Sequence, residues 1–396
     1  MLETNAPNQN NRKLRNRRAR VDARNPARSA TQRPYPRPVQ QQATKAAPLG
    51  FAAVRAWRVH QYGRPSEALQ LDDIDEPEPE PGKIRVAPTR TVLNFNEIDG
   101  CHGRYRTVNP ELPYTLGMEV LGTVDAAGEG AEEWLGRRVH ATAESAFGGY
   151  ADKVIAQPDM VFDAPESLDD TEAAAFFFPF HLAWLGLHER GQVQPGEWVL
   201  IHAAAGGVGS AAVQLAVDAG ARVIGTAGSE AKCELVRSLG AEAAVNYRDG
   251  DFATEVRDIT GGAGVDLVFD GVGGEVTEAS LRCMTRGGRL MIIGFASKIE
   301  AEDAPGLRPR LLCFSQVSIG GVLLAYSSNP AVYGGMAGFN INPRSLGDQI
   351  HDELCERLAE GRIAPLVGGT VAFEELPAAL EQMEDRLTTG RIVVVY

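Results

Sequence analysis

The sequence predicts an α/β protein in which a doubly wound parallel sheet is joined to a second domain built as a partly open β-barrel. Between about residues 55 and 163, short alternating runs of apolar and polar residues lie between glycines and prolines, which is typical of strands at short spacing. From Thr171 onward, strand-like runs alternate with helical patterns, which is typical of a parallel sheet. The chain of 396 residues exceeds what one hydrophobic core usually fills, so two domains are expected.

The first fifty residues differ from the rest of the chain. Residues 1–50 are rich in Arg, Asn, Gln and Pro, nearly lack large apolar side chains and carry a net charge of +9. This composition predicts a disordered tail, for which three interpretations stay open: a transit peptide, an arm that binds polyanions, or sequence upstream of the true start. Because the whole chain carries −13, the remainder carries −22, which argues against nucleic-acid binding outside the tail.

The predicted barrel is followed by a long apolar segment. The barrel strands are expected in the runs "VRAWRVHQYG", "KIRVAPTRTV", "VLGTVDAAGEG" and "RRVHATAE". The next segment, "TEAAAFFFPFHLAWLGLHERG", is expected to form a buried helix. Its apolar run is too short to span a membrane and contains Pro179 and His181, so no membrane association is expected.

The alternation of strands and helices continues to about residue 296. It runs through strand "EWVLIHA", a helix from Gly207, strand "RVIGTAG", helix "EAKCELVRSLG", strand "AAVNY", strand "VDLVFDGVGG", helix "EVTEASLRCMT" and strand "GRLMIIGFAS". The last helix, "SLGDQIHDELCERLAEG", and the closing strand, "GRIVVVY", cannot be assigned to either domain from the pattern. The five cysteines form no C-x-x-C pair, which favours a reducing cytoplasm over a disulfide framework or a clustered zinc site.

A glycine-rich turn follows the strand "EWVLIHA". It reads Ala204, Ala205, Gly206, Gly207, Val208, Gly209, which is the pattern G-x-G-x-x-G with alanine at the first glycine, placed between a strand and a helix. Absent side chains allow close approach to the main chain, and the free N–H groups of the helix favour an anion. The turn is therefore interpreted as a dinucleotide-phosphate loop, with a turn that binds nothing as the alternative.

The end of the next strand predicts which dinucleotide is bound. An enzyme that uses NAD normally has Asp or Glu there, but "VIGTAGSEAK" contains no acid before Glu230. A carboxylate would repel a 2′-phosphate, so its absence favours NADPH. Possible donors are Ser229 and Lys232, with Tyr247 and Arg248 after the third strand. Each has a second interpretation as a solvated surface residue, which suits Arg248 best.

The order of these motifs resembles the medium-chain dehydrogenase/reductase superfamily, and within it the zinc-independent quinone oxidoreductases. The resemblance covers about residues 52–396 and depends most on "HAAAGGVG" and on "LGAEAAVNYR". After the tail over 1–50, which its composition predicts to be disordered, the resemblance implies a GroES-like catalytic domain over 51–178, a Rossmann domain over 179–318, and a return segment over 319–396 that completes the catalytic domain. It also implies a homodimer.

The resemblance further implies roles for individual residues. Asn94 is expected near the nicotinamide ribose and the substrate. Ala205 and Gly206 to Gly209 would hold the pyrophosphate, and the 2′-phosphate contacts would come from Lys232 and Tyr247, with Ser229 beside them. The residues expected to flank the nicotinamide, or to reach the cofactor from the C-terminal segment, are Gly271, Val272, Gly273, Gly294, Phe295 and Arg386. Many relatives have Thr where this chain has His181, which serves either as a substitute donor or in helix packing.

Zinc ligands are missing where zinc-dependent relatives carry them. Asn94 stands at the position of a cysteine and Met118 at that of a histidine, and neither suits zinc in such a pair. The adjacent Cys101 and His102 lack two further ligands at suitable spacing and are interpreted as a loop near the pocket. No metal site is therefore expected.

The predicted reaction follows from the missing metal. Without a Lewis acid to stabilise an alkoxide, hydride transfer from NADPH favours a quinone or another α,β-unsaturated carbonyl, which disperses the incoming charge over its π system. Asn94, Tyr62 and Tyr105 are candidates for hydrogen bonding to the developing enolate oxygen, although each has a structural interpretation and solvent is another proton source. Two alternatives stay open: an enoyl-thioester reductase, and an NADPH-binding protein that contacts RNA through its basic tail.

Overall fold

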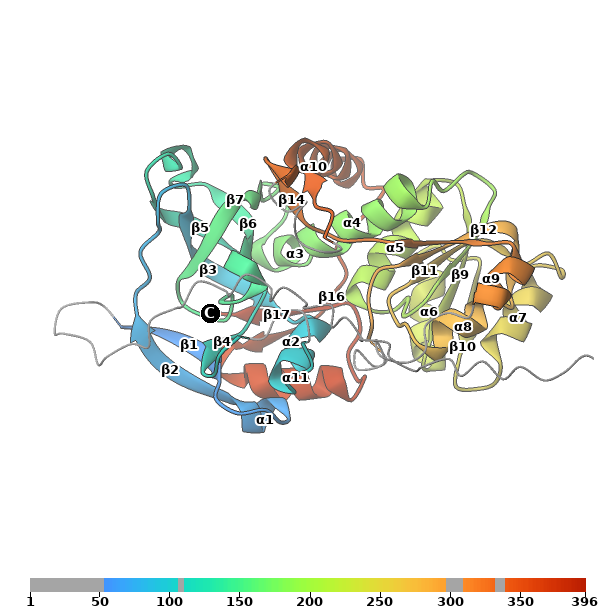
Figure 1. The fold of residues 1–396 in the computed structure, drawn as a ribbon, viewed down its shortest axis with the longest axis horizontal. Helices are drawn as coiled ribbons and strands as arrows, with labels where there is room; N and C mark the ends of the chain where they lie inside the picture. Colours follow the sequence, from blue (N-terminus) through green and yellow to red (C-terminus); the bar gives the residue numbers. More distant parts are fainter. Residues whose placement is uncertain (1–52, 106–109, 297–308, 332–338) are drawn as a thin grey trace, which may run out of the picture. The chain divides into compact units, whose positions relative to one another are not determined.

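A six-stranded parallel sheet forms in the middle of the chain, as the sequence predicts (Figure 1). The computed structural model describes residues 53–105, 110–296, 309–331 and 339–396, so the predicted disordered tail lies outside the described residues. The chain starts this sheet at its centre, builds one half outward and then returns to build the other, which is the doubly wound arrangement. The strands, in spatial order, are β10 (Ala243–Asn246), β9 (Arg222–Ala227), β8 (Trp198–Ile201), β11 (Val265–Asp270), β12 (Met284–Ile292) and β13 (Ser318–Gly321).

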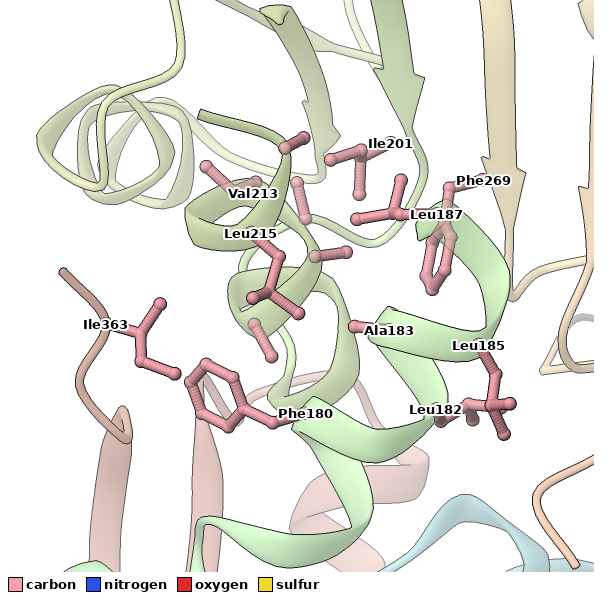
Figure 2. Packing of buried hydrophobic residues seen from close by; sticks show 14 of the residues in the cluster. Phe180, Leu182, Ala183, Leu185, Leu187, Ile201, Val213, Leu215, Phe269 and Ile363 are labelled. Carbon is pink, nitrogen blue, oxygen red and sulfur yellow. The ribbon is translucent and has the colours of Figure 1, made fainter. Parts of the chain in front are cut away.

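Apolar clusters cover both faces of this sheet because successive strand residues point to opposite sides. In β8, Val199 and Ile201 join one cluster, whereas Trp198 and Leu200 join another. Figure 2 shows part of the first cluster, with Phe180 and neighbouring side chains of one helix lying against the next. The helices of this region are α4 (Phe177–Trp184), α5 (Gly207–Asp218), α6 (Glu230–Ser238), α7 (Phe252–Ile259), α8 (Glu275–Ser280) and α9 (Pro309–Ser315).

The predicted barrel is built from both ends of the described chain. Its main sheet has the order β16-β17-β3-β5-β6-β7, and an additional pairing between β3 and β7 curls it. The strands are β3 (Ile84–Val92), β5 (Glu119–Ala127), β6 (Arg138–Ala143), β7 (Val154–Asp163), β16 (Val367–Ala372) and β17 (Arg391–Val395). A smaller sheet contains β2 (Leu69–Asp75), β1 (Ala53–Val59) and β4 (Tyr114–Thr115), and the short helices nearby are α1 (Pro65–Ala68), α2 (Phe95–Cys101) and α11 (Leu376–Glu384).

The closing strand, which the sequence pattern could not assign, is β17 and belongs to this barrel sheet. β17 pairs with β16 in parallel and with β3 in antiparallel orientation. Between β13 and β16 the chain forms the short parallel pair β14 (Tyr326–Ser327) and β15 (Asn342–Pro343), and then α10 (Arg344–Ala359), which packs on α4. The expected domain boundary after residue 178 falls inside α4, and the expected boundaries stay predictions.

The apolar segment from Thr171 to Gly191 is not one helix, contrary to the prediction. It forms α3 (Asp170–Ala174), α4 and a final π-helical turn, Leu185–Arg190. Pro179 is the third residue of α4, where its missing N–H is not needed, so the chain restarts a helix instead of continuing one. In the described part of the chain, no helix is long and apolar enough to cross a membrane.

A chain of buried polar groups joins α4 to α10 and to β7 and β14. The Nε2 atom of His351 lies 2.9 Å from the carbonyl oxygen of Asp163, and its Nδ1 lies 3.1 Å from His181 Nε2. Since a carbonyl only accepts, His351 Nε2 carries the proton, His181 Nε2 donates to His351, and the Tyr326 hydroxyl donates to His181 Nδ1 at 3.0 Å. Both ring nitrogens of His181 are therefore used in packing, in agreement with the second of its two predicted roles.

We expect His140→Leu to reduce the loss in the free energy of unfolding that acidification causes. The Nε2 atom of His140 is buried without a hydrogen-bond partner in the structure, and the ring stacks on Phe177 at 5.8 Å between centroids. Burial lowers the pKa of His140 well below its ordinary value of 6.5. Below pH 6.5 the unfolded chain therefore takes up a proton that the folded protein does not, and stability falls as the pH decreases.

Leucine removes both this proton uptake and an unpaired buried nitrogen, whose burial costs about 1–3 kcal/mol. Denaturant unfolding at several values between about pH 5 and pH 7.5 measures the effect. The variant should be at least as stable as the parent at neutral pH and should lose less stability on acidification. Identical acid slopes for the two proteins would show that His140 does not contribute.

Candidate active site

The glycine loop lies at the carboxyl end of β8, where the strand order of the parallel sheet reverses. Gly206 precedes α5, and no side chain caps the free N–H groups at the start of this helix. A Cβ at Gly209 would collide with the carbonyl oxygen of Ala203, so the third glycine is needed for close packing between the helix and the turn before it. The main chain and the helix N-terminus therefore suit a phosphate, as the sequence predicts.

Basic side chains gather at the end of β9. Ser229 caps α6 through its hydroxyl oxygen, which accepts from the backbone N–H of Lys232 at 3.4 Å. The Tyr247 hydroxyl lies 2.6 Å from where a Cβ of Gly228 would be, so this glycine allows the phenol to approach the strand end. Burial lowers the pKa of Lys232; Tyr247 acts in the opposite direction, and the positive charges of Arg248 and Arg386 lower it further. An anion bound here would relieve this repulsion.

The segment Arg386–Gly390 comes from the C-terminal part of the chain and lies on the glycine loop. The N–H of Gly390 donates to the carbonyl of Ala205 at 2.8 Å, and Gly206 and Gly390 form an isolated β-bridge. The Lys232 ammonium donates to the carbonyl oxygens of Arg386 and Thr388, each at 2.8 Å. Lys232, which the sequence predicts to bind phosphate, therefore also forms hydrogen bonds with this segment.

Arg386 has a backbone conformation that normally requires glycine. Its φ is +60°, and it follows the last turn of α11. The N–H of Arg386 donates to Met383 O, and the N–H of Leu387 donates to Gln382 O, each at 2.9 Å. These two bonds form a Schellman motif, in which glycine is the usual residue at this position. Arginine is therefore strained at a position where glycine would end the helix without strain.

The residues expected beside the nicotinamide come together at the ends of β11 and β12. A Cβ on Gly294 would lie 3.2 Å from the carbonyl oxygen of Gly271, and one on Gly273 would lie 3.5 Å from Phe295 Cα. Asp270 is fully buried and accepts from the N–H groups of Val272 at 2.8 Å and Gly273 at 3.0 Å. The two segments therefore form one surface at the same edge of the sheet as the glycine loop.

Asn94 lies in a buried network of charged groups just before α2. Its amide nitrogen donates to Glu97 Oε1 at 3.1 Å, and its backbone N–H donates to Glu97 Oε2. Its amide oxygen accepts from Arg391 Nη1 at 2.7 Å, and Arg391 Nη2 pairs with Glu119. Because both ends of the amide are bound, its orientation is defined.

Two carboxylates share one guanidinium in this network. Burial is the main cause that raises the pKa of Glu97, to about 8, and the charge of Glu119 adds to the effect. Burial also raises the pKa of Glu119, although Arg391 opposes this shift. The stem of Arg391 passes so close to Gly207 that a Cβ there would collide with its Cδ. Arg391 thus contacts the glycine loop with its stem and Asn94 with its charged end.

The two predicted tyrosine donors lie near α2. The Tyr105 hydroxyl donates to the carbonyl oxygen of Asn96, so its proton is engaged, and burial raises its pKa. The Tyr62 ring packs over Gly103, 2.7 Å from where a Cβ would be, and is 46% exposed. Both residues stay predictions as proton donors.

Cys101 and His102 are not in a loop, contrary to the prediction. Cys101 is the last residue of α2 and is buried, whereas His102 caps the helix and bonds Glu384 of α11 at 2.7 Å. A short amphipathic stretch such as "NEIDGCHG" gives a weak helix signal, and packing of α2 against α11 stabilises it. Among the described residues, no three His, Cys, Asp or Glu side chains are grouped to hold a metal ion.

Several residues of the site were not predicted from the sequence. These are Glu97, Glu119 and Arg391, which form the network around Asn94. Arg248 was named as a possible donor with a surface role as its alternative interpretation, and it lies among the cations at the end of β9. Glu119 and Arg391 lie 272 positions apart, so no local pattern connects them.

A doubly wound sheet with an uncapped glycine loop at its switch point is typical of dinucleotide-dependent oxidoreductases. The family model described as zinc-binding dehydrogenase matches residues 207–336. The chain is 30% identical over 353 residues to the quinone oxidoreductase of Sus scrofa, an alignment that covers 87% of this chain and 99% of the relative. The chain belongs to the medium-chain dehydrogenase/reductase superfamily and is a quinone oxidoreductase-like member of it.

The chain is also similar to a solved structure and to part of a much longer protein. The Escherichia coli quinone oxidoreductase, whose structure is of a complex with NADPH, superposes with a TM-score of 0.76 at 28% identity, covering 86% of this chain and 100% of that one. A phenolphthiocerol/phthiocerol polyketide synthase polypeptide of Mycobacterium tuberculosis is 32% identical over 346 residues, 87% of this chain. The present chain spans only 15% of the length of that synthase polypeptide.

We expect Arg386→Gly to separate fold stability from cofactor binding. Glycine removes the strain of a left-handed residue, about 1 kcal/mol, so the melting temperature should stay equal or rise. The loss of a charge-assisted contact should weaken NADPH binding about tenfold or more while changing NADH binding little. Thermal unfolding and binding titrations measure the two effects.

Leu387→Ala serves as the control, because Leu387 is the exposed neighbour of Arg386 and adds no charge to the site. Its NADPH affinity should match that of the parent. A fall in melting temperature for Arg386→Gly, or an equal loss of affinity for both dinucleotides, would count against a phosphate-binding role.

Proposed function

We propose that the protein is an NADPH-dependent, zinc-independent reductase that transfers a hydride to a quinone or another α,β-unsaturated carbonyl. The observation that carries this proposal is the buried amide of Asn94, oriented by Glu97 and by Arg391, whose stem lies on the glycine loop. This arrangement brings a neutral hydrogen-bonding group, in place of a metal ligand, next to a predicted cofactor site.

The residues present fit a dinucleotide with a 2′-phosphate. The uncapped start of α5 and the close-packed glycines suit the pyrophosphate, and Lys232, Arg248 and Arg386 supply positive charge where an acid would select NAD. When bound, the nicotinamide supplies the hydride. The chain's own residues would hold the two phosphate groups, cover the ring with the Gly271–Gly273 and Gly294–Phe295 segments, and place the amide of Asn94 beside substrate or ribose.

The acceptor class follows from what the site offers to a developing negative charge. An amide donor stabilises an enolate modestly, whereas an alkoxide would need a cation or a metal. A conjugated acceptor disperses the charge itself, and solvent, Tyr62 or Tyr105 would supply the proton. The alignment with a polyketide synthase favours enoyl-thioester reduction as a second candidate, since the same hydride chemistry then acts on a carrier-bound acyl chain.

The assembly and location of the protein are further proposals. β13 is the last strand in the parallel sheet, and within the described ranges no strand pairs with its outer edge, which suits pairing with a second copy in a homodimer. All five cysteines lie in the described residues and are unpaired, which is compatible with a reducing cytoplasm. Binding of RNA through the tail stays an untested alternative.

We expect NADPH oxidation with quinones and enones and none with simple ketones. Steady-state assays with a quinone, an enone, an enoyl-CoA ester and a saturated ketone test the acceptor class.

Asn94→Ala should lower kcat/KM about 100-fold, the effect typical of losing one donor at a developing oxyanion. Asn96→Ala, an exposed amide on the same helix, should have little effect because Tyr105 bonds only the backbone of Asn96. Preference for the enoyl ester would favour the second candidate, and turnover of the ketone alone would refute both.

Activity should also persist in the presence of a strong chelator, and the purified protein should contain no stoichiometric zinc. The reason is chemical: an amide bound to Glu97 and Arg391 stands where a thiolate would be, and a thioether stands where an imidazole would be. Elemental analysis measures the metal, with a zinc-dependent alcohol dehydrogenase treated in parallel. One tightly held zinc per chain would overturn the predicted reaction.

A further inference from the structure

The segment Arg386–Gly390 is fastened at both ends to the barrel part of the site. Before it, Glu384 bonds His102 at 2.7 Å, and Asp385 pairs with Arg64 at 3.3 Å, which joins the end of α11 to the α1 and α2 region. After it, Arg391 binds Asn94 and Glu119. The two ends are therefore fixed by side chains of the barrel part.

The segment itself is held by α6 and by the glycine loop. Lys232 donates to the carbonyl oxygens of Arg386 and Thr388, and Gly390 donates to Ala205. Leu387 is 71% exposed and contributes little packing. Thr389 and Gly390 pack against the backbone of residues 366–368, whereas the start of the segment, with its strained turn, is held by hydrogen bonds, two of which come from Lys232.

We infer that Lys232 is a positioning residue that fastens the segment Arg386–Gly390 over the glycine loop, in addition to any contact it makes with a 2′-phosphate. This inference rests on the proposed function, from which it takes the dinucleotide as the ligand of the site. Lysine has three N–H donors, of which two go to carbonyl oxygens, so one is left for an anion. The hydrogen bonds from Lys232 keep Arg386 beside Lys232 and Arg248. They also keep Gly390, the residue directly before Arg391, in contact with Ala205.

A positioning role for Lys232 predicts different effects from a role in phosphate binding alone. NADH lacks the 2′-phosphate, so the loss of a pure phosphate ligand would leave NADH binding unchanged. The loss of a positioning residue loosens the segment that contacts the glycine loop and so weakens both dinucleotides. It also changes the protein before any cofactor is added.

The test compares Lys232→Met with Lys232→Arg and Arg237→Met. Methionine keeps the length and apolar stem of lysine but not its donors, and arginine restores donors that reach both carbonyls. Arg237 lies on the same helix and pairs with the exposed Glu230, away from the segment, so its replacement controls for loss of a cation from α6.

Hydrogen exchange of the ligand-free protein, followed by mass spectrometry over about residues 385–392, gives the first readout. In Lys232→Met, exchange in this segment should rise about tenfold, NADH affinity should fall about five- to tenfold, and NADPH affinity should fall further. Lys232→Arg should recover most of each change, and Arg237→Met should match the parent.

Two results would overturn the inference: unchanged exchange in Lys232→Met, or a loss of affinity confined to NADPH. The proposed function fails differently, because a parent protein that binds neither dinucleotide would refute the cofactor, whereas exchange in the ligand-free protein would still report whether Lys232 holds the segment.

Discussion

The site depends on one buried cation, the guanidinium of Arg391. It pairs with Glu119, bonds the amide oxygen of Asn94, and its stem fills the space that a side chain at Gly207 would take. Removing one partner of such a buried pair typically costs about 3–5 kcal/mol, because the remaining charge is left without compensation. Arginine suits this position because it stays charged when buried and presents several donors in a fixed plane. The glycine at 207 is thus required by the barrel strand as much as by a cofactor.

The fold explains how Arg391 reaches the glycine loop. Arg391 is the first residue of β17, which lies between β16 and β3 in the barrel sheet. Gly390, just before it, has a φ of +55° and is pressed against the carbonyl of Leu366 on one side and bonded to Ala205 on the other. The chain can pass from its contact with the glycine loop into strand β17 within one residue only because this position has no side chain. The C-terminal strand therefore sets the distance between the two halves of the site.

Local signals in the sequence account for much of this structure. The glycine loop, each single strand or helix of the alternation, and the missing acid at the end of β9 are visible within about ten residues of sequence. The glycine loop and the alternation are found where they were predicted. The network around Asn94 could not be predicted in this way, because Asn94 and Arg391 are 297 positions apart and meet only through the pairing of β17 with β3. Pro179 was visible as a helix-breaking residue, yet the break lies just before it, between Ala174 and Phe177, and α4 then continues through Pro179 and packs against α5. His181 shows the same limit, since its two partners come from β14 and α10.

Charge differs between the two ends of the candidate site, and this difference bears on the acceptor. At the end of β9, Lys232, Arg248 and Arg386 act on one another as like charges, so this end suits an anion. Around Asn94, the guanidinium of Arg391 pairs with Glu119, and burial raises the pKa of both Glu97 and Glu119. The positive charge of Arg391 is thus already paired with a carboxyl group, which leaves it less able to stabilise an alkoxide. This pairing agrees with the proposed conjugated acceptor, which spreads the charge of the incoming hydride over its own π system, on grounds separate from the missing zinc ligands.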